Sequence, residues 1–116
     1  MSARSILACL AIAAYAAPAL AHAFLDHAAP GAGETIASPP KQVALAFTEQ
    51  LEAAFSGVTV TDPAGRDVDA GKAVIAGESM TVALKTIGPG TYRVTWHAVS
   101  VDTHRTEGAY SFTVKP

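Results

Sequence analysis

The feature that most constrains this chain is a series of short apolar/polar alternations, which begins near Lys41 and is broken repeatedly by glycine, proline and aspartate. A period of two residues is that of a β-strand with one buried face. The alternation is strongest over residues 91–99, where one face carries Tyr92, Val94, Trp96 and Ala98. Since no segment beyond residue 21 shows a long helical period, the sequence predicts an all-β fold.

Five more segments fit short strands, and turn residues separate them. The segments are 43–47, 57–61, 72–76, 80–85 and 108–115. Residues 62–65 read as a turn with proline second and glycine last, and residues 53–55 allow one helical turn at most. About seven strands at intervals of roughly ten residues predict a two-sheet antiparallel sandwich or a Greek-key β-barrel.

The amino-terminal segment is typical of a secretory signal peptide. Arg4 is its only charge, residues 6–20 are apolar and rich in alanine, and small residues follow. This interpretation divides the chain into a cleaved segment, 1–21, and one domain, 22–116. Cleavage after Ala21 would leave His22 first, and cleavage after Ala23 fits equally well. An uncleaved membrane anchor is disfavoured because no basic stop-transfer cluster follows.

Charge and sulfur content restrict the possible ligands. The 116 residues carry a net charge of −2, which offers no basic field for nucleic acid. Removal of 21 residues leaves 116 − 21 = 95, with 8 − 1 = 7 basic and 10 acidic side chains, a net charge of −3. Cys9 leaves with the signal peptide, so the mature chain has no disulfide. The methionines are Met1 and Met80 alone, so a Met-rich Cu(I) site cannot form.

Candidate metal ligands occur at two places. Asp102 and His104 are separated by one residue and can point the same way from extended backbone. A terminal His22 would add its α-amine and its ring nitrogen as a chelate. One amine, two imidazoles and one carboxylate form a nitrogen-rich donor set that favours Cu(II). Taken alone, the Asp-x-His pattern is weak and is more often a solvated loop.

Four segments together resemble the CopC family of periplasmic copper-binding proteins. They are HAFLDHAAPG at 22–31, AFTEQLEAAFSG at 46–57, GTYRVTWHAVSVDTH at 90–104 and GAYSFTVK at 108–115. The resemblance implies a seven-stranded Greek-key β-barrel, similar to cupredoxins and immunoglobulin sandwiches. It further implies a monomeric, non-enzymatic periplasmic protein that binds Cu(II) for sequestration, resistance or trafficking. Its expected partner is a CopD-like inner-membrane copper transporter.

The resemblance assigns the Cu(II) ligands to His22, Asp102 and His104. Glu49 matches a glutamate near the site in some relatives, although a solvated acid at a strand end is the simpler interpretation. The Met-rich Cu(I) loop of some members is missing. Arg105 follows His104 where relatives often have proline, which leaves this loop freer to move.

Other polar and aromatic residues receive structural interpretations first. His27 lies well beyond His22 along an extended arm, so it is assigned to the surface, with an accessory ligand as the alternative. His97 lies on the face opposite Trp96 and is expected to face solvent or to stand behind a ligand rather than to bind the ion directly. Trp96 and Tyr92 are core anchors. Three aspartates suggest a calcium loop superficially but lack its ligand spacing, so they are assigned to turns: Asp62, Asp67 and Asp69.

Two other functional classes remain as alternatives. A terminal histidine with a second histidine also resembles the copper site of lytic polysaccharide monooxygenases, so a small copper oxidase is one alternative. Such enzymes are generally larger and have a broad substrate face, whereas this chain offers no aromatic platform beyond residues that its core needs. A metal-free adhesion sandwich is the other alternative.

Overall fold

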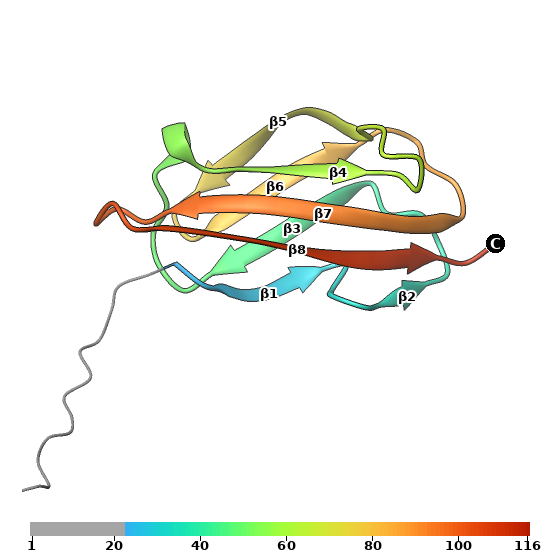
Figure 1. The fold of residues 1–116 in the computed structure, drawn as a ribbon, viewed down its shortest axis with the longest axis horizontal. Helices are drawn as coiled ribbons and strands as arrows, with labels where there is room; N and C mark the ends of the chain where they lie inside the picture. Colours follow the sequence, from blue (N-terminus) through green and yellow to red (C-terminus); the bar gives the residue numbers. More distant parts are fainter. Residues whose placement is uncertain (1–22) are drawn as a thin grey trace, which may run out of the picture.

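The computed structural model describes residues 23–116, which form a sandwich of two four-stranded sheets (Figure 1). The first sheet has the order β1-β3-β6-β5, with β1 at Leu25–Ala29, β3 at Gln42–Phe47, β6 at Ser79–Leu84 and β5 at Asp69–Ala76. The second has the order β2-β8-β7-β4, with β2 at Thr35–Ile36, β8 at Arg105–Val114, β7 at Gly90–Val99 and β4 at Gly57–Thr61. The predicted all-β sandwich is confirmed.

Two strands precede the region where the alternation begins, so the described chain has eight strands rather than about seven. β1 buries no side chain completely and therefore lacks a clear alternation. β2 is only two residues long and pairs in parallel with the end of β8. The remaining neighbours in both sheets are antiparallel. The single helical turn at Ala53–Phe55, η2, is confirmed as a 3-10 turn.

Strand β7 has the predicted alternation. Its buried face carries Tyr92, Val94, Trp96 and Ala98, while His97 on the opposite face is half-buried. β7 and β8 pair without a bulge over ten residues, from Gly90 opposite Val114 to Val99 opposite Arg105. This long hairpin reverses at residues 100–104, at the same end of the sandwich as the start of β1 and η2 (Figure 1).

Aromatic contacts join the strands within the core. Phe47 of the first sheet meets Trp96 of the second edge to face, with ring centroids 5.1 Å apart. Tyr92 and Phe112 stack at 5.6 Å within the β7–β8 hairpin. Each fully buried large apolar side chain contributes about 1.5–3 kcal/mol to folding. The Phe47–Trp96 contact joins the two sheets near the carboxyl end of β7 and thereby packs the β7–β8 hairpin against the first sheet.

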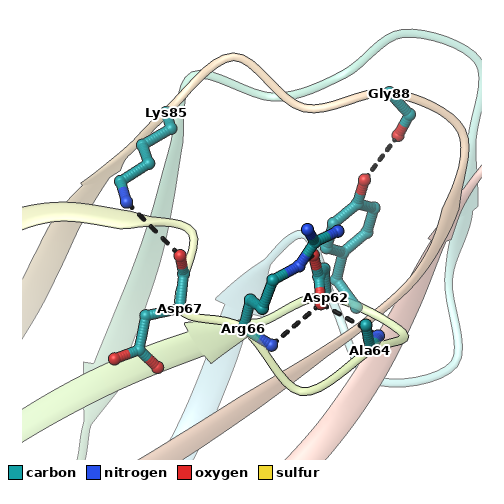
Figure 2. Close-up of polar contacts among 7 residues, drawn as sticks. Asp62, Ala64, Arg66, Asp67, Lys85 and Gly88 are labelled. Carbon is teal, nitrogen blue, oxygen red and sulfur yellow. Dashed lines mark hydrogen bonds and ion pairs between the residues drawn. The ribbon is translucent and has the colours of Figure 1, made fainter.

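Asp62 and Asp67 lie at the far end of the sandwich, in and beside a turn (Figure 2). The Asp62 carboxylate accepts the backbone N–H groups of Ala64 and Arg66, each at 2.9 Å, and the Arg66 Nε at 3.0 Å. The Arg66 N–H is the largest cause of a lowered pKa at Asp62. Asp69 accepts the N–H of Val60 at 3.0 Å. The assignment to a turn is confirmed for Asp62. It is wrong for Asp69, which is the first residue of β5, and Asp67 forms an isolated bridge with Thr61 at the end of the turn.

Two more contacts close this far end. The Tyr92 hydroxyl donates to the Gly88 carbonyl at 2.8 Å, and the Lys85 ammonium reaches the Asp67 carbonyl at 3.5 Å (Figure 2).

Within residues 23–116, no helix has the length and apolar character needed to cross a membrane.

Gly108 leaves space for the Trp96 indole because it has no side chain. Replacement of Gly108 should therefore destabilise the fold. A Cβ at residue 108 would lie 2.7 Å from Trp96 Cζ2, its cross-strand neighbour. Gly108→Ala is expected to lower the free energy of unfolding by about 1–3 kcal/mol, because the indole or β8 must shift. Urea unfolding followed by Trp96 fluorescence measures this.

Gly88→Ala is the matched control, since a Cβ there would meet nothing within 4 Å. Equal unfolding midpoints for the two variants would contradict the packing role of Gly108.

Candidate metal centre

The β7–β8 hairpin reverses through a closed loop that is attached to a neighbouring segment. The Ser100 N–H donates to the His104 carbonyl at 2.9 Å, and the Thr103 N–H donates to the Ser100 carbonyl at 2.8 Å. Thr103 adopts a φ of 73°, an uncommon conformation for a β-branched residue. The Val101 N–H donates to the Gln50 carbonyl at 3.1 Å. These bonds fix the backbone from which Asp102 and His104 project.

The loop brings together the two ligands predicted within it. His104 Nδ1 lies 3.4 Å from Asp102 Oδ1, and the two side chains are 52% and 37% exposed. An acidic oxygen and an imidazole therefore share one solvent-accessible point. A carboxylate beside an imidazole nitrogen can either share a metal ion with it or accept its proton when no ion is bound.

Ser100 controls the charge of this pair. Its side chain is 1% exposed, and its hydroxyl donates to Asp102 Oδ1. This hydrogen bond is the largest cause of a lowered pKa at Asp102, and the side chain and backbone of His104 lower it further. Asp102 is therefore an anion at neutral pH, as a carboxylate ligand must be.

His22, the third predicted ligand, lies outside the described residues, but the two residues that follow it are held firmly. Ala23 is fully buried, and its carbonyl accepts the Thr106 hydroxyl at 2.6 Å. The Phe24 N–H donates to Thr48 Oγ1 at 3.0 Å, and its carbonyl accepts the Thr48 N–H at 2.9 Å. Because Thr106 is two residues beyond His104, the described chain begins beside the strand that carries this ligand.

The remaining candidates lie on other segments of the chain. Glu49 is half-buried in the segment after β3. His27 lies on β1 and pairs with Asp26 at 3.1 Å. His97 lies against Gly57, where a Cβ would be 3.0 Å from its ring, and it lines a groove of about 440 Å³ beside β4 and β5. Among residues 23–116, no three His, Cys, Asp or Glu side chains form a group suited to a metal ion.

The described part of the chain contains one methionine, Met80, which lies in the core with no exposed surface. Its thioether is therefore inaccessible to an ion at the hairpin. Within residues 23–116, the accessible donors at this end are oxygens and imidazole nitrogens, which suit Cu(II) better than Cu(I).

Comparison with known proteins places this sandwich in a family. Residues 25–115 match the CopC domain. The crystal structure of CopC from Methylosinus trichosporium OB3b superposes with a TM-score of 0.76 at 34% identity, and covers 82% of this chain and 95% of that one. The chain belongs to the CopC family.

Relatives of similar length and one longer protein show the same likeness. Copper resistance protein C of Escherichia coli is 39% identical over 107 residues, which are 84% of each chain. Protein YobA of Escherichia coli strain K12 is 38% identical over 99 residues, 82% of this chain and 80% of that protein. Copper transport protein CutJ of Bacillus subtilis is 36% identical over 98 residues, 81% of this chain but only 18% of CutJ.

The sequence analysis missed Ser100 and the two threonines, Thr48 and Thr106. Ser100 had a usable signal, because it lies two residues before Asp102 and such spacing places side chains on one side of extended backbone. The contact between Thr106 and Ala23 spans 83 residues of sequence and has no local pattern.

Removal of the Ser100 hydroxyl should raise the pKa of Asp102. In Ser100→Ala, the carboxylate loses its main donor and its pKa moves up toward the ordinary value. A depressed folded-state pKa gives stability above the unfolded pKa, which is lost as the pH falls through the folded value, so the variant should lose less stability in acid. Carboxyl ¹³C NMR titration measures the shift.

Asp62 is the control within the same spectra, since its lowered pKa depends on Ala64 and Arg66 at the other end. An unchanged Asp102 titration in Ser100→Ala would refute the assigned cause.

Proposed function

We propose that this chain is a periplasmic protein that binds Cu(II) for copper sequestration, resistance or trafficking. The observation that carries the proposal is the Asp102–His104 pair, held by the closed hairpin beside Ala23. Family relatives that are named for copper resistance and copper transport support copper as the ion. His22, Asp102 and His104 are the proposed ligands, and the copper ion is the cargo.

The chemistry of the donors favours the cupric ion. His22 as a first residue offers its α-amine and ring nitrogen, His104 offers a second ring nitrogen, and Asp102 offers an oxygen. Nitrogen-rich, tetragonal donor sets select Cu(II), whereas Cu(I) prefers thioethers and thiolates. The burial of Met80 agrees with this choice.

The packing of Ala23 supports signal cleavage after Ala21 rather than after Ala23. Cleavage after Ala23 would remove a residue with no exposed surface and the acceptor of the Thr106 hydroxyl. Loss of a buried side chain and of a hydrogen-bond partner both cost stability. Cleavage after Ala21 keeps both and makes His22 the first residue.

A binding role without catalysis is proposed for this site. The Asp102 carboxylate is exposed toward the same point as the His104 imidazole, so it would occupy a coordination position that oxygen chemistry needs. The relatives' names describe resistance and transport rather than a reaction.

The proposed partner is a CopD-like copper transporter of the inner membrane. CutJ supports it, because this copper transport protein contains a segment similar to this chain that makes up only 18% of its length. A domain like this one thus occurs joined to a much larger copper transport protein. As a separate chain, the protein would exchange the ion with such a partner by ligand substitution.

Intact mass of the exported protein tests the processing step. The expected mass is that of residues 22–116, with a free amine on His22, because only this cut retains the buried Ala23. A mature protein that begins at Phe24 would contradict both the cleavage site and the ligand set.

Acidification should weaken Cu(II) binding strongly. The α-amine and the two imidazoles must be free of protons to bind, so the affinity should fall by several orders of magnitude, about 10³-fold or more, between about pH 7.5 and pH 5. Asp102 adds little to this loss, since its lowered pKa keeps it ionised there. Competition titration with a chelator of known affinity measures the change.

His104→Ala is the control for this titration: it lacks one imidazole and should show both weaker binding and a shallower pH dependence. Equal affinity of the unaltered protein at the two pH values would exclude the proposed donors.

A further inference from the structure

Two threonine hydroxyls hold the start of the described chain, and they come from different sheets. Thr48 directly follows β3 of the first sheet, and Thr106 lies in β8 of the second. Thr106 Oγ1 donates to the Ala23 carbonyl at 2.6 Å, and Thr48 Oγ1 accepts the Phe24 N–H at 3.0 Å. We call these two side chains the threonine clamp. The peptide unit between Ala23 and Phe24 is thus bound from both directions.

The Thr106 half of the clamp is partly buried, whereas the hydrogen bond between Phe24 and Thr48 Oγ1 is exposed. Ala23 has no exposed surface, and the Thr106 hydrogen bond is partly buried. A buried carbonyl that loses its hydrogen-bond donor destabilises the fold, because water cannot reach it to form a replacement hydrogen bond. Thr48 also donates its own N–H to the Phe24 carbonyl at 2.9 Å, so Phe24 is paired with Thr48 in both directions.

The position of the clamp relates it to the candidate metal centre. Thr106 follows His104 by two residues and is opposite Ala98 in the continuous β7–β8 register. The Ala23 carbonyl is therefore bonded directly to the strand that follows His104. Consecutive Cα atoms are about 3.8 Å apart, so anchoring Ala23 limits how far from this point the preceding residue can reach.

We propose that Thr48 and Thr106 are positioning residues for copper binding, which fix the backbone at Ala23–Phe24 so that the amino-terminal donors meet Asp102 and His104. This inference rests on the proposed function, since it requires His22 to be a ligand. An unattached chain end would lose conformational entropy when it binds the ion. Because the clamp already holds this segment in the folded protein, that entropic cost is smaller and the affinity is higher. Neither threonine touches the ion in this account.

The principal variant is Thr106→Val, which removes the hydroxyl and keeps the β-branched shape that suits a strand. Loss of a hydrogen-bonding partner behind a metal ligand typically weakens binding about 10–100-fold, and a decrease of about 10-fold or more in Cu(II) affinity is expected. Thr106→Ser restores the donor and should recover most of the affinity. The copper EPR spectrum of Thr106→Val should also change its nitrogen coupling, which a loss of stability alone would not cause.

Thr113→Val is the matched control. It removes a hydroxyl from the same strand, where Thr91 and Thr113 share a hydrogen bond at 3.0 Å at the far end of β8. Its Cu(II) affinity and EPR spectrum should equal those of the unaltered protein. If Thr106→Val does not fold by circular dichroism, Thr48→Val removes the other hydroxyl of the clamp and carries the same expectation.

A double-mutant cycle separates positioning from a general structural effect. The second background carries His22→Ala and an acetylated Gly-Ser extension before residue 22, so the His22 ring and a free α-amine are both absent. There, Thr106→Val should change the residual affinity less than about twofold, because it has nothing left to position. An equal loss in both backgrounds would overturn the proposal.

The same series distinguishes this inference from the proposed function. Tight, His104-dependent Cu(II) binding that Thr106→Val and Thr48→Val leave unchanged would overturn the clamp and leave the proposed function standing. Absence of tight Cu(II) binding by the unaltered mature protein would overturn both.

Discussion

The uninterrupted antiparallel pairing of β7 with β8 is the constraint on which the other features depend. Ten consecutive residue pairs fix where the chain reverses, and no bulge shifts the register. The reversal therefore presents Asp102 and His104 at one end of the sandwich, and the same register places Thr106 beside Ala23. On the buried face of the hairpin, Trp96 lies over Gly108 and contacts Phe47 of the other sheet. The same pair of strands therefore forms part of the core and positions the candidate site.

The electrostatics of the candidate centre follow from a buried hydroxyl. Ser100 is enclosed within the hairpin and directs its proton to Asp102, which lowers the pKa of this carboxyl. The imidazole of His104 then lies beside a permanent negative charge. A cation that arrives at this point meets a site whose anionic ligand needs no deprotonation, whereas its nitrogen donors compete with protons.

The sequence predicted those features that depend on local periodicity. The buried face of β7 followed from alternation alone. The approach of Asp102 to His104 was also predicted, but from an extended backbone, whereas the structure brings them together in a turn with Thr103 at a φ of 73°. Strand β1 was not predicted, because its side chains are half-buried or exposed and give no period of two.

Contacts between segments far apart in the sequence could not be predicted from local sequence patterns. Thr106 and Ala23 are 83 residues apart, and their hydrogen bond follows from how the two sheets close on each other. His22 lies outside the described residues, so its role as a ligand stays a prediction, as do the accessory roles considered for Glu49, His27 and His97.

The complete burial of Ala23 has a consequence for the order of events during export. A signal peptidase reads the residues around its cut as an extended, accessible chain, whereas Ala23 in the finished sandwich is enclosed and bonded to Thr106. Under the proposed processing, the leader must be removed while this segment is still unpacked. Maturation would then precede closure of the two sheets, and the copper ligand at the new terminus would come into being before the scaffold that holds it.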